Sequence, residues 1–296
     1  MFPFRKIVFP VDYSEPCRAI VPYVDEMSRR FSADLTLVHA YGPEALARSP
    51  RPIADPELPE EARVLEQERL RRFAEENFPE HHTDSLAELG EPGCVLDTIV
   101  QRDGADLVML ATHGRGPVRR FLLGSVTAKV LHDLGSAVWT GRGSVFAGHN
   151  PRLPYKSILC ALDLMPEAET PEAEAPEAEA AVRIAAAFAR CYDAQLCLLH
   201  VVEPLPVTYR IDFRCYEKEL IEAADLRLRE LKRKLGVEAP HLVIGGPVAE
   251  SVREEAVRRG ADLIVTGRGR SQGSFSAMLS RLYPIVRHAP CPVLSV

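Results

Sequence analysis

The sequence predicts an α/β fold made of two tandem doubly wound domains, each built on a parallel sheet. Three apolar runs occur twice, in the same order along the chain. They are short, rich in branched residues and free of polar alternation, as strands buried on both faces of a parallel sheet are. The paired runs are residues 6–12 with 157–163, 33–39 with 194–200, and 104–110 with 260–266.

Helical patterns separate these runs in both copies. In the first copy, Ser14 is placed to cap a helix, and Pro22 is expected to kink it or shorten its first half. The inner face of this helix is expected to contain Ile20, Val24, Met27 and Phe31. The second copy has a comparable apolar stripe, predicted to be core, at Leu220, Ala224, Leu228, Leu231 and Leu235.

A length of 296 residues suits two domains, at roughly 150 residues each. Turn-forming residues gather at 142–155, so the domains are expected to span 1–145 and 154–296. The second copy has ten extra residues between its first and second strands. They belong to an acidic Pro-Glu-Ala segment, residues 166–180, which lacks large apolar groups and is expected to form a mobile loop.

The composition excludes several classes of protein. A net charge of -6 denies the chain the basic surface needed to bind nucleic acid or anionic lipid. No apolar stretch is long enough to span a membrane, and no apolar signal segment opens the chain, so a cytoplasmic protein is expected. Seven cysteines, never spaced as CxxC, indicate neither a disulfide framework nor a zinc site, and no metal site is expected.

Candidate ligand-binding residues follow the predicted strands, because open α/β sheets bind ligands beyond the carboxyl ends of their strands. In the first copy, Asp12 ends one run, and a glycine-containing loop at 111–116 follows another. The next helix is expected to start at Gly124 and Ser125, with Ser125 as the N-cap.

This loop and the start of the helix together suit an anion. Gly114 and Gly116 allow close approach of the backbone, and a helix start offers N–H groups and the positive end of the helix dipole. Arg115 and the Ser125 hydroxyl could assist with phosphates, while Asp12 could accept hydrogen bonds from ribose. The alternative from the residues alone is that the glycines only turn the chain and Asp12 caps its own helix.

Other phosphate and catalytic signatures are missing from the sequence. It has no GxxxxGK[ST], no GxGxxG after the first run and no GxSxG. No catalytic residue is therefore assigned.

Four segments resemble the universal stress protein family, in a tandem form that covers nearly the whole chain. They are residues 10–16 (Pro-Val-Asp-Tyr-Ser-Glu-Pro), 37–39 (Leu-Val-His), 90–92 (Gly-Glu-Pro) and 111–125. The ATP-binding branch of the family shows G-x2-G-x9-G-[ST]. Here Gly114, Gly124 and Ser125 match that spacing, and Ala111 replaces the first glycine.

The resemblance implies a Rossmann-like sandwich fold and a site for an adenine nucleotide in the first domain. It places Asp12 at the ribose, near Ala111, and the backbone around Pro10 and Val38 at the adenine. The phosphates would be surrounded by Gly114, Arg115, Gly116, Gly124, Ser125 and Val126. The expected ligand is ATP, with ADP or AMP as alternatives and Mg²⁺ as a companion ion.

The second copy departs from this pattern. Gly267 restores the first glycine, but Arg270 stands where Gly114 does, and Ser280 with Arg281 replaces the Gly-Ser pair. We therefore expect one working site and a degenerate second half that serves as a built-in partner. The alternative is that Arg268, Arg270 and Arg281 bind some other anion.

Family members pair through their last strands, which correspond here to residues 137–140 and 292–296. The resemblance thus implies an intramolecular pseudo-dimer, with further homo-oligomers plausible. It also implies a regulatory ATP-binding protein of the stress response. The alternatives are a slow ATPase or autophosphorylating enzyme, with Ser125 or Thr127 near the γ-phosphate, and a stress protein that dimerises without nucleotide.

Overall fold

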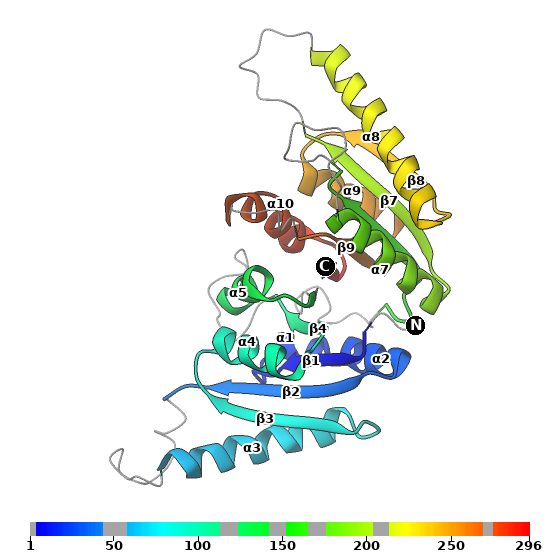
Figure 1. Cartoon of the computed structure of the whole chain (residues 1–296). Helices are drawn as coiled ribbons and strands as arrows, with labels where there is room; N and C mark the ends of the chain where they lie inside the picture. The colour runs from blue at the N-terminus through cyan, green and yellow to red at the C-terminus, as the bar shows by residue number, and fades with distance from the viewer. Residues whose placement is uncertain are drawn as a thin grey trace. The chain divides into compact units, whose positions relative to one another are not determined.

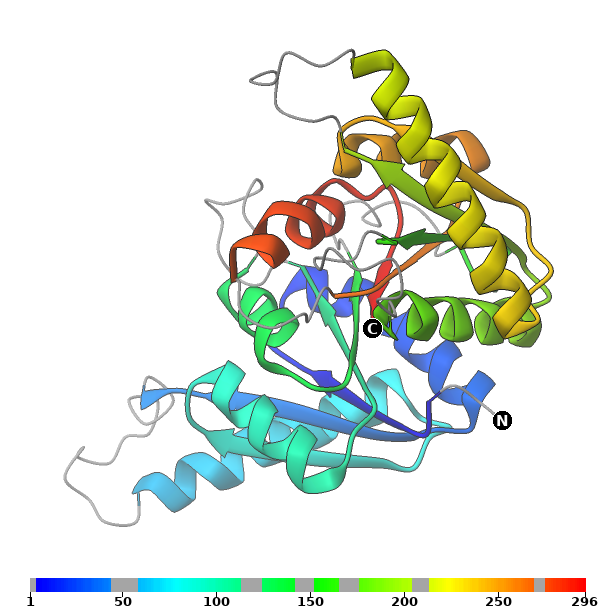
Figure 2. The same ribbon diagram turned by 45° about the horizontal axis from the view of Figure 1, so that its top comes forward.

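The computed structural model describes residues 4–43, 58–112, 124–141, 152–164, 176–203, 213–268 and 275–296. The chain forms two compact units, Met1–Pro151 and Arg152–Val296. Within each unit, strands and helices alternate along the chain, as the colours of Figures 1 and 2 show.

The first unit contains a parallel sheet in the order β3-β2-β1-β4-β5. Because crossovers between parallel strands are right-handed, α1 to α3 cover one face of the sheet and α4 and α5 the other. The elements are β1 Lys6–Pro10, α1 Glu15–Ala19, α2 Val21–Phe31, β2 Asp34–Tyr41, α3 Leu58–Asn77, β3 Thr83–Leu89, α4 Pro92–Asp103, β4 Leu107–Ala111, α5 Ser125–Asp133 and β5 Ala137–Gly141.

The second unit repeats this plan, with a parallel sheet in the order β8-β7-β6-β9-β10. The prediction of parallel α/β sheets in both halves is therefore confirmed. The elements are β6 Ser157–Leu162, α7 Pro176–Tyr192, β7 Gln195–Val202, α8 Phe213–Leu235, β8 His241–Gly245, α9 Val248–Arg259, β9 Leu263–Thr266, α10 Phe275–His288 and β10 Val293–Ser295.

Large aromatic side chains fill the core of each unit. In the first, the Trp139 indole is completely buried and lies 5.3 Å from the ring of Tyr23. In the second, the rings of Tyr155 and Phe188 both contact Tyr192, at centroid distances of 5.0 and 5.9 Å. Rings of this size bury large areas. Because the rings of each cluster belong to the same unit, each unit has a core of its own.

The helical patterns after the first run are confirmed in detail. Ser14 is the N-cap of α1 and accepts a hydrogen bond from the backbone of Cys17. The helical stretch breaks at Ile20, and Pro22 lies in the first turn of α2, where its missing N–H costs nothing. The four predicted inner residues are at most 1% exposed.

The repeated Gly-Ala-Asp triplet, found in the sequence without an assigned role, ties strands together. Asp106 accepts hydrogen bonds of 2.9 and 3.1 Å from the backbone of residues 5–6, where β1 begins. Asp262 does the same for residues 156–157 at β6, at 2.7 and 3.1 Å. In each triplet the glycine ends the preceding helix with a positive φ, of 63° or 59°, which only glycine adopts at little cost.

The expectation of a loop throughout 166–180 is wrong for its last five residues. Helix α7 begins at Pro176, so residues 176–180 are helical, and Ala178 is buried. The physical reason is local. Alanine and glutamate are strong helix formers, proline suits the first helical position, and Glu177 and Glu179 complement the helix dipole. Residues 165–175 lie outside the described part.

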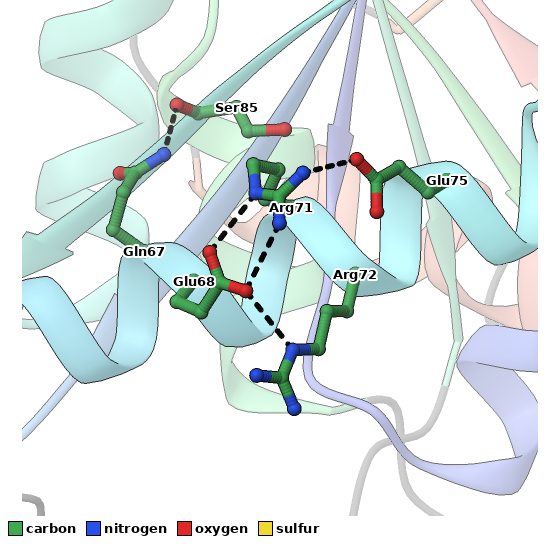
Figure 3. Close-up of polar contacts among 6 residues, drawn as sticks. All are labelled: Gln67, Glu68, Arg71, Arg72, Glu75 and Ser85. Atoms are coloured by element: carbon green, nitrogen blue, oxygen red, sulfur yellow. Dashed lines mark hydrogen bonds and ion pairs between the residues drawn. The ribbon is translucent and has the colours of Figure 1, made fainter.

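A side-chain amide covers the edge strand of the first unit. Gln67, on α3, donates from Nε2 to the carbonyl oxygen of Ser85 at 2.7 Å (Figure 3). It also accepts from the Ala87 N–H at 3.0 Å. These are the backbone groups that another strand would pair with. Beside it, Glu68 forms ion pairs with Arg71 and Arg72 on the solvent face of the same helix.

Removing this amide should open the edge of β3. In Gln67→Ala, the Ala87 amide hydrogen is expected to exchange several-fold faster, since a hydrogen bond contributes about 1 kcal/mol. Self-association beyond the wild-type level is expected at high concentration, measured by light scattering. The control is Gln67→Glu, which keeps the acceptor for Ala87 and should retain slow exchange there. Unchanged exchange at Ala87 in Gln67→Ala would show that the contact does not protect the edge.

Candidate functional site

The site is located where the strand order of the first unit reverses, between β1 and β4. These strands are paired in parallel, so Pro10 at the end of β1 and Ala111 at the end of β4 lie at the same edge of the sheet. Val38 of β2 is the register partner of Pro10. The structure thus brings Pro10, Val38 and Ala111 to one edge of the sheet, the edge at which open α/β sheets bind ligands.

Two hydrogen bonds from β2 hold the chain just after β1. The backbone N–H of Val11 donates to the Val38 carbonyl at 2.8 Å. Nδ1 of His39 lies 2.6 Å from the Val11 carbonyl oxygen and must carry the hydrogen, because a carbonyl only accepts. The Nε2 of this buried ring is 3.5 Å from the Glu66 carboxylate. The sequence marked Leu-Val-His as a motif but assigned no role to His39.

Asp12 stabilises the turn in which it lies. Its Oδ1 accepts hydrogen bonds from the N–H and the hydroxyl of Ser14, at 2.9 and 2.6 Å. Ser14, not Asp12, caps the helix, so this oxygen of Asp12 holds the turn just before the cap. A carboxylate has two oxygens and about four lone-pair sites, so Ser14 takes only part of its accepting capacity.

Tyr13, between these two residues, was not singled out by the sequence. It has a positive φ of 62°, unusual for a residue with a side chain, and this turns the chain from β1 towards α1. Its ring lies 4.7 Å from the His39 ring and 5.7 Å from that of Phe73, and the Arg69 guanidinium is 3.9 Å from its centroid. Packing against α3 thus sets the conformation of the turn.

Cys17, the cysteine of α1 just after this turn, is inert. Its side chain is 3% exposed, and its Sγ lies 3.9 Å from the Pro10 carbonyl oxygen. Burial, reinforced by the charge of Asp12, raises the pKa of the Cys17 thiol to about 12. A thiol that stays protonated at neutral pH is a poor nucleophile.

The start of α5 reaches the same edge of the sheet. Gly124 donates its N–H to the Thr112 carbonyl at 3.0 Å, and the Thr127 hydroxyl donates to the Ala111 carbonyl at 3.1 Å. The prediction of Ser125 as N-cap is wrong. Gly124 is the N-cap and Ser125 the first helical residue, because the contact with Thr112 fixes Gly124 in an extended conformation.

A glycine N-cap offers the helix no side-chain acceptor. Among the described residues, none caps α5 through its side chain. The first N–H groups of a helix have no partner within the helix, so those of Ser125 and Val126 can bind an anion. The predicted Gly114, Arg115 and Gly116 lie in residues 113–123, outside the described part.

The matching edge of the second unit is arranged differently. Nδ1 of His200 lies 2.9 Å from the Leu162 carbonyl oxygen, so this histidine holds the end of β6 as His39 holds the end of β1. The guanidinium of Arg281, from α10, forms ion pairs with Asp163 and Glu203. The Arg268 side chain is buried, and Arg270 lies outside the described residues.

Two further features of the described residues bear on the nature of the site. In the part of the chain that the structure describes, no three or more His, Cys, Asp or Glu side chains are grouped so as to hold a metal ion. No helix there is long and apolar enough to cross a membrane.

Comparison with known proteins settles the family. The sequence model of the universal stress protein family matches residues 3–140 and again residues 154–296. The chain belongs to the universal stress protein family. Two copies of the family domain follow one another in it, as the internal repeat and the two sheets indicate.

Individual relatives match one half of the chain at a time. A universal stress protein of Thermus aquaticus is 31% identical over 148 residues, which are 48% of this chain and 98% of the relative. Universal stress protein A homolog 1 of Coxiella burnetii is 32% identical over 149 residues, or 48% of this chain and 96% of the relative.

Solved structures share the fold over the whole chain. A universal stress protein of Archaeoglobus fulgidus matches with a TM-score of 0.67 and 18% identity, covering 98% of this chain and 95% of its own. A protein of unknown function from Pseudomonas aeruginosa matches with a TM-score of 0.69 and 13% identity, covering 99% and 92%. At this identity the likeness shows the fold alone.

The contrast between His39 and His200 leads to a prediction for the second unit. Burial lowers the pKa of His200, and in the described structure its buried Nε2 has no hydrogen-bond partner. The unfolded chain therefore binds a proton more readily than the folded one, so stability rises with pH. As the pH falls below the ordinary histidine value of about 6.5, the second unit should lose stability progressively.

Amide hydrogen exchange in β6 and β7, corrected for intrinsic rates, measures this effect between pH 7 and 5. The control is His200→Asn, whose amide can still donate to the Leu162 carbonyl but does not titrate. An equal loss of protection in this variant and the wild type would exclude His200 as the cause.

Proposed function

We propose that this universal stress protein binds one adenine nucleotide per chain, in its first unit, and acts as a regulatory protein whose state follows nucleotide occupancy. One observation carries the proposal. The glycine-capped start of α5 is tied to the end of β4, beside the Asp12 turn at the end of β1. Donors suited to phosphate and an acceptor suited to ribose therefore share one edge of the sheet.

The residues present fit such a ligand. The Ser125 and Val126 N–H groups, at the positive end of α5, would receive phosphate oxygens. Asp12 would accept from a ribose hydroxyl, and backbone groups near Pro10 and Val38 would contact the adenine. Ala111 in place of the family's glycine limits how closely the ribose can approach the chain there. Gly114, Arg115 and Gly116 would complete the phosphate site.

ATP is the ligand we favour, and ADP and AMP would use the same contacts, because N–H groups recognise phosphate rather than the number of phosphates. Mg²⁺ would accompany the nucleotide through its phosphate oxygens, as it commonly does in nucleotide sites.

Binding rather than turnover is the activity these residues favour. Thr127, one candidate phosphate acceptor, is 3% exposed, and its hydroxyl donates to the Ala111 carbonyl. A buried hydroxyl already held by the backbone is poorly placed to attack a phosphate. Ser125 remains the candidate acceptor for the enzyme alternative, and sustained phosphate release abolished by the nucleotide-site variants would favour it.

Counting nucleotides tests the proposal. Purified protein is denatured with acid, the released nucleotide is identified by mass spectrometry, and ligand-free protein is titrated with ATP by calorimetry. We expect one nucleotide per chain. Gly124→Arg should abolish binding, because a large side chain would enter the phosphate site. The backbone of Gly124, at φ -58° and ψ 146°, tolerates any residue, so this variant should fold.

Two matched controls accompany this test. Gly135→Arg makes the same change beyond the other end of α5, where an added Cβ meets nothing within 4 Å, and should bind normally. Asp12→Asn keeps an oxygen acceptor for Ser14 and so preserves the turn. Asp12→Ala removes the acceptor and should weaken nucleotide binding by roughly 10- to 100-fold. No nucleotide and no heat in the wild type would contradict the proposal and favour a stress protein that acts without nucleotide.

A further inference from the structure

Three charged side chains meet at the carboxyl edge of the second unit. Arg281, on α10, donates from Nη1 to Oδ2 of Asp163, which follows β6. It donates from Nη2 to Oε2 of Glu203, which follows β7, at 3.0 Å. The guanidinium therefore bridges the ends of two adjacent strands.

The internal repeat shows what the first unit has at the same three positions. Asp163 corresponds to Asp12, the residue we assign to the ribose. Glu203 comes three residues after His200, as Gly42 comes three residues after His39. Arg281 stands at the position of Ser125. A glycine and a serine in one unit are thus replaced in the other by a glutamate and an arginine.

These two replacements match each other chemically. The glutamate adds a negative charge and the arginine a positive one, and the structure pairs them with each other and with the retained aspartate. Ser125 is the first residue of α5, whereas Arg281 is the seventh residue of α10, so the matching position in the second unit lies inside a helix. The donors of Arg281 are already directed to carboxylates.

Helix α7 packs closely against the neighbouring part of this edge. A Cβ added to Gly267, at the end of β9, would lie 3.3 Å from Cβ and 3.4 Å from the carbonyl oxygen of Glu177 on α7. The corresponding residue of the first unit is Ala111, which has a Cβ. Gly267 therefore serves the close approach of α7, and the glycine that resembles the family motif is used for packing.

We propose that Arg281 is the built-in occupant of the second unit's nucleotide position, held there by Asp163 and Glu203, and that it excludes phosphate ligands from this unit. The inference rests on the proposed function of the first unit. The two carboxylates neutralise the guanidinium and would lie beside any anion that approached it. This arrangement disfavours the alternative in which Arg281 receives an anion.

Amide exchange in the full-length chain tests the ion pairs without any nucleotide. Arg281→Gln should raise exchange in the described part of α10 and at the end of β6 by up to about fivefold, because exposed ion pairs contribute modestly. Arg281→Lys, which cannot form two parallel donor contacts, should give an intermediate change. High salt should raise exchange in the wild type but not in Arg281→Gln. Identical exchange in all three proteins would overturn the ion-pair bridge.

Pyrophosphate titration tests the exclusion of phosphate. It is done in the Gly124→Arg background, so that the first unit is silent. Asp163→Asn combined with Glu203→Gln leaves Arg281 unpaired, and should create weak pyrophosphate binding that disappears when Arg281→Gln is added. Two results would overturn the proposal: Arg281-dependent binding before the carboxylates are neutralised, or no binding after they are.

A failure of this inference can be told apart from a failure of the proposed function. Loss of nucleotide binding by the first unit would appear in the ATP titration of the wild type. The exchange experiment would still report whether Arg281 bridges β6 and β7.

Discussion

A single histidine hydrogen bond determines where the ligand-facing chain begins in each unit. His39 and His200 lie on the strand beside the first strand of their unit. His39 contacts the carbonyl just after β1, at 2.6 Å, and His200 contacts the carbonyl that ends β6, at 2.9 Å. The aspartate that follows is held in place by this contact. The start of α5 is positioned separately, through its contacts with Thr112 and Ala111, so the candidate site depends on both sets of polar contacts.

The two histidines have different surroundings, and this has physical consequences. His39 has the Glu66 carboxylate 3.5 Å from its Nε2, whereas the Nε2 of His200 is buried without a hydrogen-bond partner in the described structure. Burial without a partner disfavours the charged ring. In the second unit, the histidine that makes this bond therefore has a lowered pKa.

The two units also differ in the charges at the carboxyl edge of the sheet. In the first unit the helix that approaches the edge begins with glycine and serine, which leaves its N–H groups accessible to an anion. In the second, an arginine at the matching position is neutralised by two carboxylates of its own chain. The sheet is therefore alike in both units, because its strands must be buried. The residues at the exposed carboxyl edge are under no such constraint, and they differ between the units.

The sequence by itself determined the elements whose cause is local. Short branched apolar runs indicated buried parallel strands, Ser14 and Pro22 indicated how the first helical stretch begins and breaks, and the repeat indicated two similar units. The placing of Asp12 and Ala111 at one edge followed from the rule that parallel strands end together, whereas Pro10 and Val38 came from the resemblance to the family.

Tertiary structure alone decided the features that need partners distant in sequence. Gly124 rather than Ser125 caps α5 because Thr112 accepts its N–H, and Gln67 covers the edge of β3 because α3 packs beside it. The bond between Arg281 and Asp163 spans 118 positions. Local periodicity records which side of an element is buried, but it carries no information about which distant group meets an exposed charge. That pairing depends on how the strands are ordered in the sheet.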